Sequence, residues 1–275
     1  MKRLCIHTIT TKPWELETAF EKYSEAGIKG VTVWQDALQT SGLSRTRTLL
    51  AGSGLDVVAY CRGGFFPHTG QSGREQAIEN NKKMLDEAAA IQAPMLVLVC
   101  GAAVGQSLET SRDQIKKGIE VLLPRAEENK VSLAIEPLHP MYADTRSAIN
   151  SLAMANDFAE YFDSQWIGVA IDVYHVWWEP ELRQEIMRCG KNNNLLAFHI
   201  CDWKVPTVDM LLDRGIIGEG CIPIQKISEW VDEAGFTGYR EVEIFSKLYW
   251  EQEQDRFLEK IVTAYKKHYP LDIDT

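Results

Sequence analysis

Four side chains of metal-binding type stand at or near the ends of short apolar runs in the second half of the chain. They are Glu136 in SLAIE, Asp172 in IGVAID, His199 in LLAFHI and Glu243 in EVEIF. Carboxylates and an imidazole suit hard divalent cations such as Mn2+, Mg2+ or Co2+, with Zn2+ as a further candidate. A single residue of this kind is more often a helix cap, a residue that anchors a loop, or a buried polar residue whose hydrogen bonds are made within the core. Four at successive run ends predict one divalent-metal site.

The apolar runs belong to a pattern that covers the chain, in which short β-branched segments alternate with longer amphipathic ones. This alternation is typical of repeated βα units around a parallel sheet. Eight strands are expected, at residues 3–8, 30–34, 55–61, 94–100, 132–137, 167–172, 195–200 and 241–245. Helical segments between them include residues 13–27, 73–93, 110–130 and 225–235. The first should end at Gly27, and the one over 110–130 should open with a Ser or Thr cap.

Eight such units without a Gly/Ser/Pro-rich linker or a GxGxxG fingerprint predict a single (β/α)8 TIM barrel, one domain over residues 1–275. In this fold the active site lies at the C-terminal ends of the strands, so the four side chains should converge. Strand residues two positions apart share a face, which places Ala134, Ala170 and Ala197 beneath the site. Glu241 breaks this small-residue pattern behind Glu243. We expect it to be a deeper supporting carboxylate, or to exchange roles with Glu243.

Composition narrows the function classes. The chain has a formal net charge of -10 and no Lys/Arg-rich run, which disfavours binding to nucleic acid or to anionic lipid. Neither a signal peptide nor a membrane span is readable. The six cysteines show no CxxC spacing, as expected of reduced thiols. A soluble cytoplasmic protein without disulfides is therefore expected.

Several ordered motifs resemble those of the xylose isomerase-like TIM barrels, which include hydroxypyruvate isomerase, ketose 3-epimerases, inosose dehydratase and endonuclease IV. The motifs are IEPLHP (135–140), IDVYH (171–175), FHICD (198–202), GEGCIPI (218–224) and GYREVEIF (238–245). The resemblance covers nearly the whole chain. It implies that the same four residues, Glu136, Asp172, His199 and Glu243, bind one divalent cation, and it suggests a homo-oligomer, either a dimer or a tetramer.

The resemblance also implies substrate-binding roles for His175 and Arg214. An imidazole can hydrogen-bond a substrate oxygen, and a guanidinium can grip a hydroxyl or carboxylate. The alternative for Arg214 is an ion pair with Asp209 or Asp213. His139 stands where hydroxypyruvate isomerase has Asn, which argues against hydroxypyruvate as the substrate.

Further residues near the expected mouth complete the candidate site. Segment 61–70, CRGGFFPHTG, is predicted to be an active-site loop with Arg62 and His68 as its reactive side chains. Aromatic side chains could form a wall against a sugar. They are Trp34, Phe65, Phe66, Trp177, Trp178 and Trp203, of which Trp34 and Trp203 are the preferred substrate contacts.

These residues favour proton abstraction next to a carbonyl of a small carbohydrate-like substrate, through an enediolate that a Lewis-acid metal stabilises. By resemblance, Glu136 and Glu243 are the pair that removes and returns the proton, so the expected activity is that of a sugar isomerase or epimerase. The runner-up is a dehydratase or lyase acting on a keto-sugar, inosose or dehydroshikimate-like compound, with His175, His139 or His68 as the acid. The lack of a Gly-rich phosphate cradle favours an unphosphorylated substrate.

Two other classes are less favoured. A nuclease like endonuclease IV would need a trinuclear zinc cluster and a basic groove, whereas this chain has six histidines and a charge of -10. A non-catalytic sugar-binding barrel would leave the four ligand positions without a purpose.

Overall fold

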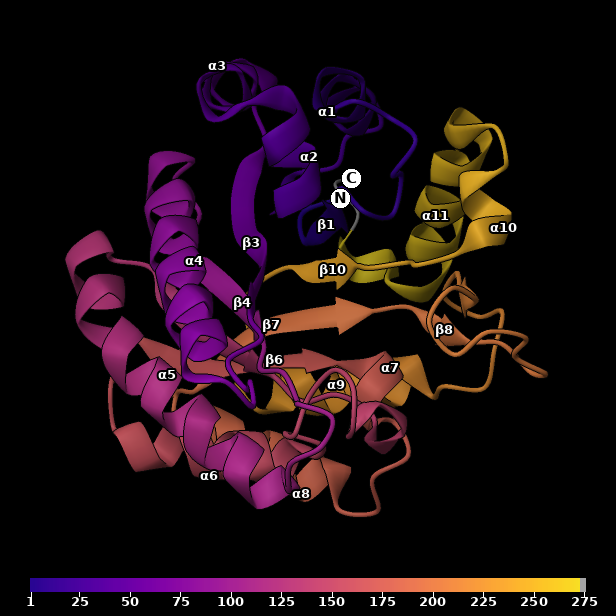
Figure 1. Cartoon of the computed structure of the whole chain (residues 1–275). Helices are drawn as coiled ribbons and strands as arrows, with labels where there is room; N and C mark the ends of the chain where they lie inside the picture. The colour runs from indigo at the N-terminus through magenta and orange to yellow at the C-terminus, as the bar shows by residue number, and fades with distance from the viewer. Residues whose placement is uncertain (273–275) are drawn as a thin grey trace.

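The computed structural model describes residues 1–272. Within them, eight parallel strands close into a barrel in the order β1-β10-β7-β6-β5-β4-β3-β2. The barrel strands are β1 Leu4–His7, β2 Gly30–Trp34, β3 Asp56–Gly64, β4 Met95–Val99, β5 Ser132–Glu136, β6 Ile167–Asp172, β7 Leu195–Ile200 and β10 Arg240–Val242. All eight predicted strands are present, and the predicted (β/α)8 barrel is confirmed (Figure 1).

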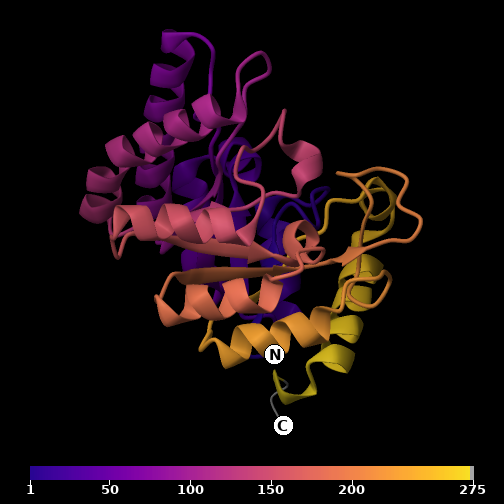
Figure 2. The same cartoon turned by 90° about the horizontal axis from the view of Figure 1, so that it is seen from below.

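Helices connect the strands and form a layer outside them, as the view turned by 90° shows (Figure 2). They are α1 Leu16–Glu25, α2 Gln35–Ser41, α3 Leu43–Ser53, α4 Gln71–Ala90, α5 Leu108–Asn129, α6 Leu152–Phe162, α7 Val173–Val176, α8 Leu182–Lys191, α9 Ile224–Glu233, α10 Lys247–Trp250 and α11 Gln254–His268. Two 3-10 turns, η1 Pro140–Tyr142 and η2 Pro270–Asp272, and a small antiparallel pair, β8 Asp202–Trp203 with β9 Arg214–Gly215, complete the elements. In Figure 1 the strand arrows point toward the end of the barrel at which β8 and α10 lie.

Local signals explain the helix boundaries. Ser107 caps α5, its hydroxyl accepting a hydrogen bond from the Thr110 backbone N–H at 3.0 Å. A serine therefore does cap this helix, but it lies three residues before the predicted segment begins. Helix α1 buries Phe20 and Tyr23 against the barrel. It stops just before Gly27, whose φ of 74° lies in the left-handed region that favours glycine.

Small side chains fill the barrel interior below its C-terminal end. Ala134, Ala170 and Ala197 are completely buried there and pack in one cluster with Cys61 and Val97. Larger residues at these three positions would occupy the space that the polar heads above them need. The predicted small layer beneath the site is confirmed.

Strand β3 is longer than predicted, and this corrects the assignment of segment 61–70. The strand continues through Gly64, which pairs with Val99 of β4, so Arg62 lies on a strand and the loop begins only after Gly64. A Cβ at Gly64 would lie 2.0 Å from the Val99 carbonyl oxygen, which is why no larger residue fits. The Asn81 side chain holds this turn, accepting from the Gly64 N–H and donating to its carbonyl.

Strand β10 is shorter than predicted, with Glu243 directly after its last residue. The Glu243 N–H still donates to the Ile200 carbonyl at 3.3 Å. The next N–H, that of Ile244, donates instead to the Thr10 hydroxyl at 3.0 Å. At Ile244 a side-chain hydroxyl thus replaces the backbone carbonyl of a neighbouring strand as the hydrogen-bond acceptor, so β10 ends and Glu243 lies at the strand end.

The structure bears on two sequence predictions, the absence of a membrane span and the absence of disulfides. No helix in residues 1–272 has both the length and the apolar character needed to cross a membrane. All six cysteines are free thiols, as predicted.

Candidate active site

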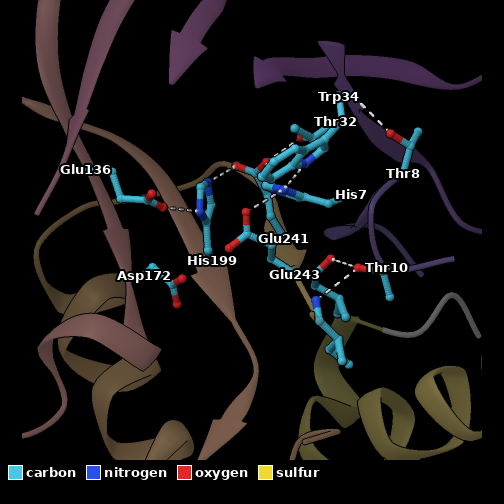
Figure 3. Close-up of polar contacts among 12 residues, drawn as sticks. His7, Thr8, Thr10, Thr32, Trp34, Glu136, Asp172, His199, Glu241 and Glu243 are labelled. Carbon is cyan, nitrogen blue, oxygen red and sulfur yellow. Dashed lines mark hydrogen bonds and ion pairs between the residues drawn. The ribbon is translucent and has the colours of Figure 1, made fainter. Parts of the chain in front are cut away.

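The four predicted ligand residues meet at the C-terminal end of the barrel. Glu136 ends β5, Asp172 ends β6, His199 lies in β7 and Glu243 follows β10, and these strands are neighbours in the barrel. One ligand atom from each of the four lies within 4.8 Å of all the others, and all four residues are buried. Figure 3 shows Glu136 on one side of His199 and Glu243 on the other. We call this group the tetrad.

Contacts within the tetrad partly balance its charge. The Nδ1 atom of His199 lies 3.0 Å from a Glu136 carboxylate oxygen. Arg214 donates from one nitrogen to Asp172 at 2.8 Å and to Glu243 at 2.7 Å. Three buried carboxylates therefore share one guanidinium and one imidazole.

The pKa values reflect this surplus of negative charge. Burial raises the pKa of Asp172 to about 7; Arg214 opposes the rise, and the Glu243 and Glu136 carboxylates add to it. Burial also disfavours the charged form of Glu243, but Arg214 and His7 outweigh it and hold the pKa of Glu243 well below its ordinary value. A cation placed among these oxygens would relieve their repulsion.

The donor set of the tetrad fits a divalent cation. Three carboxylates and one imidazole within a few ångströms match the oxygen-rich sites of Mn2+, Mg2+ and Co2+, and Zn2+ also accepts such ligands. His199 could bind a cation through its Nδ1 atom, which faces Glu136. Its other ring nitrogen, Nε2, lies 3.9 Å from a Glu241 carboxylate oxygen. Neither that Nε2 atom nor the facing Glu241 oxygen has a hydrogen-bond partner among the described residues. Metal-binding histidines usually direct their second nitrogen to such a carboxylate.

A second polar layer lies beneath the tetrad and is built around Glu241. One Glu241 oxygen lies 3.1 Å from the His7 Nε2 atom and accepts from the Thr32 hydroxyl at 2.5 Å. The other nitrogen of His7 lies 3.2 Å from Glu243 and 3.1 Å from the Trp34 indole N–H. His7 therefore connects the deeper carboxylate to the tetrad (Figure 3).

The two carboxylates beside His7 favour its charged form. Burial lowers its pKa, but hydrogen bonds with Glu241 and Glu243 outweigh burial and raise the pKa to about 9. The Trp34 indole N–H is placed to donate to the same Nδ1 atom at 3.1 Å. That hydrogen bond needs an unprotonated Nδ1, whereas the ion pair with Glu243 needs a protonated one. The sequence interpretation missed His7, although this residue lies next to the end of the first predicted strand and closes β1 in the structure, so the strand-end rule used for the tetrad could have found it.

A small cavity of about 20 Å3 lies above the tetrad. Glu136 and Glu243 line it together with Trp34, His175 and Arg214, so these three predicted substrate contacts face the same cavity as two tetrad carboxylates. An open-chain sugar needs more room, and side chains around the cavity must move to admit it. A larger hollow of about 300 Å3, lined in part by Lys12, Trp14 and Asp36, has no tetrad residue on its walls.

His175 and Arg214 interact with each other as well as with the tetrad. Arg214 donates to the His175 Nε2 atom at 3.2 Å. Burial and this guanidinium lower the pKa of His175 well below its ordinary value, so the ring is neutral. The alternative partners of Arg214 were wrong: Asp213 contacts Lys204 at 3.1 Å, and Asp209 accepts from nearby backbone N–H groups.

The remaining predicted contacts lie outside this cavity. His139 and Trp203 form an aromatic cluster in which Trp203 stacks on Tyr174 at 4.7 Å and both His139–Trp203 and His139–Trp178 ring centres are 5.5 Å apart. His68 is exposed and lines a surface hollow that Arg62 also borders.

Comparisons with known proteins agree with this architecture. Residues 20–261 match the family model described as xylose isomerase-like TIM barrel. The protein SMc04130 from Sinorhizobium meliloti 1021 is 42% identical, with 97% of this chain and 98% of that chain covered and a TM-score of 0.94. A search of curated proteins found no match.

Two more distant structures share the fold. The IolI protein, solved with a zinc atom, is 17% identical over 99% of this chain and 100% of that chain, with a TM-score of 0.85. The 3-keto-D-glucoside 4-epimerase YcjR from E. coli is 16% identical over 98% of this chain and 100% of that chain, with a TM-score of 0.79. The fold, the family model and the 42% identical structure together show that this chain belongs to the xylose isomerase-like TIM barrel family.

Proposed function

We propose that this protein is a divalent-metal-dependent isomerase or epimerase of a small sugar or keto-sugar. The observation that carries the proposal is the tetrad, four buried ligand residues with donor atoms within 4.8 Å of one another at the C-terminal end of the barrel. Two structural relatives support it, since one is a 3-keto-D-glucoside epimerase and one was solved with zinc. Glu136, Asp172, His199 and Glu243 would hold the cation. When bound, it would supply a Lewis acid that polarises a substrate carbonyl.

Glu243 and Glu136 would transfer the proton. Arg214 and His7 keep Glu243 ionised, so it can take a proton from the carbon next to the carbonyl. Glu136 lies across His199 from Glu243 (Figure 3) and lines the same cavity, so it can return the proton on the other face. A positioned base of this kind contributes about 100- to 10,000-fold in rate.

His175 would orient the substrate, and Arg214 would hold two of the proposed metal ligands. The neutral His175 ring carries a nitrogen, Nδ1, that has no hydrogen-bond partner among the described residues, and the side chain faces the cavity. It can bond a substrate hydroxyl. Arg214 is engaged by two carboxylates, so its main effect is to fix Asp172 and Glu243.

The same feature of His175 favours one alternative, a dehydratase or lyase. A neutral imidazole is too weak an acid for this step, so His175 would first have to take up a proton; its Nδ1–H could then protonate a hydroxyl on the β carbon as that group leaves. His139 and His68, the other predicted acids, do not line the cavity, so His175 is the acid that the geometry retains.

Solvent deuterium exchange distinguishes these activities. The protein with Mn2+ would be incubated in D2O with a panel of ketoses, keto-sugars and inososes, and again after chelation. Deuterium in a rearranged or epimeric product, lost with the metal and in Glu243→Gln, supports an isomerase or epimerase. Loss of water to an enone moves the assignment to a dehydratase. Exchange that survives chelation, or no exchange with any compound, contradicts the proposal.

A further inference from the structure

Two arginines line the cavity above the tetrad without an acidic partner. Arg62 comes from β3 and Arg146 from the segment after η1, and both are half-buried. Within residues 1–272 neither side chain forms a hydrogen bond or an ion pair, whereas the two buried arginines, Arg214 and Arg240, both do. Arg214 in the same cavity binds Asp172 and Glu243, and Arg240 binds Asp232 and Asp272. Cations removed from water without a partner are costly.

Aromatic rings hold the two guanidinium groups and leave their N–H edges available. Arg62 lies 5.5 Å from the Trp34 ring centre and 5.0 Å from that of Phe65. Arg146 lies 5.6 Å from the ring centre of Tyr142, which also lines the cavity. Stacking uses the face of a guanidinium, so the donors on its rim stay free to bind an anion.

The two cations also affect each other. Burial, followed by the charge of Arg146, lowers the pKa of Arg62. Nearby Glu243 and Glu136 oppose this effect without offering a hydrogen bond. The cavity therefore has a carboxylate region at the tetrad and a cationic region at the arginines.

We propose that Arg62 and Arg146 bind an anionic group of the substrate, a carboxylate or a phosphate monoester, at the end away from the reacting carbonyl. The inference rests on the proposed function and narrows its substrate class. Guanidinium forks match the oxygens of both anions and need no Gly-rich loop. The missing phosphate cradle therefore does not exclude a phosphorylated substrate. Repulsion by Glu136 and Glu243 would direct the anionic end to the arginines and the carbonyl to the tetrad.

Three compounds that share one ketone and differ at C6 test this inference. They are D-fructose, D-fructuronate and D-fructose 6-phosphate. Their binding to the metal-free protein would be measured by calorimetry, which does not depend on turnover. The variants are Arg62→Gln, Arg146→Gln and the charge-conserving Arg62→Lys. Arg47→Gln is the matched control, because Arg47 is exposed and lines a different hollow beside Asp56 and Gln92.

We expect D-fructuronate or D-fructose 6-phosphate to bind more tightly than D-fructose, and the preferred anion identifies the group. Arg62→Gln and Arg146→Gln should each weaken binding of the preferred anion by about 10- to 100-fold and leave binding of D-fructose unchanged. The Arg47→Gln control should bind all three compounds like the unchanged protein. Arg62→Lys should retain part of the preference, which separates loss of charge from loss of folding. The inference is overturned if neither anion is preferred, or if the preference persists in both Gln variants. Deuterium exchange into a neutral ketose would then still support the proposed function.

Discussion

The carboxylate region and the cationic region of the cavity differ in how their charges are paired. In the carboxylate region, Glu136 contacts His199, and Glu243 contacts both Arg214 and His7. In the cationic region, Arg62 and Arg146 lie over aromatic rings and have no hydrogen bond or ion pair to another described side chain. The first region is already organised by the protein, as a site for a cation and proton transfer should be. The second leaves its donors free, as a site that waits for a ligand should.

The largest expected effect follows from breaking the carboxylate region at Glu243. Glu243→Gln removes the proposed base, and the rate of deuterium exchange at saturating Mn2+ should fall by about 100- to 10,000-fold. The control is Glu87→Gln, which replaces another buried carboxylate, hydrogen-bonded to Tyr60 on the outside of the barrel. If Glu243→Gln lowers the rate no more than Glu87→Gln does, Glu243 is not the base.

The next effect concerns cation binding by the tetrad. Mn2+ at 100 times its dissociation constant should stabilise the native protein by about 2.7 kcal/mol. Asp172→Asn should remove most of this stabilisation, measured by urea unfolding with Mn2+ and with chelator. Glu233→Gln, whose side chain is exposed at the end of α9, serves as the control and should respond to Mn2+ like the unchanged protein. An equal response in Asp172→Asn would place the cation elsewhere.

A smaller effect is expected from the layer beneath the tetrad. Glu241→Gln leaves all four tetrad ligands in place but weakens the acceptor that faces His199 and holds His7. Mn2+ affinity should fall by about 10- to 100-fold, measured by titration calorimetry. Glu87→Gln again provides a buried comparison. Unchanged affinity in Glu241→Gln would limit Glu241 to a packing role.

The smallest effect lies outside both regions, at Glu179. Burial raises the pKa of Glu179 from 4.5 to about 7, against the opposing hydrogen bond from the Leu152 N–H. Because the folded-state pKa is the higher one, folding favours the protonated acid, and its contribution to stability is lost as pH rises from about 4.5 to about 7.

Glu179→Gln removes this penalty and keeps an oxygen that can accept from Leu152. At pH 8 the free energy of unfolding of the variant should therefore exceed that of the unchanged protein by about 1 to 2 kcal/mol. At pH 4 the two proteins should differ little. The measurement is urea unfolding at both pH values. A variant that is less stable at pH 8 would mean that the charged carboxylate is favoured as a helix cap.

The sequence predicted the features that repeat along the chain. Strand-end residues such as Asp172 and His199 were found because apolar runs reveal the strands, and the strand ends of a closed barrel converge. Residues placed by irregular geometry were harder to predict. Arg62 was assigned to a loop because GG suggested a turn, whereas Asn81 and β4 keep that segment in the strand.

Long-range partners account for the other differences. Arg146 follows a 3-10 turn and has no periodic signal, so only the folded chain brings it beside Arg62. The partners of Arg214 were sought among Asp209 and Asp213, nearby in sequence, whereas the fold supplies Asp172 and Glu243. Spacing along the chain carries no information about such contacts.

The central claim is that the tetrad, and not the deeper layer, holds the catalytic cation. Anomalous X-ray scattering from crystals grown with Mn2+ tests it most directly. The account predicts one strong peak between Glu136, Asp172, His199 and Glu243. A peak between His7, His199 and Glu241, which also bring their ligand atoms within 4.8 Å of one another, or a peak at neither place, would contradict it.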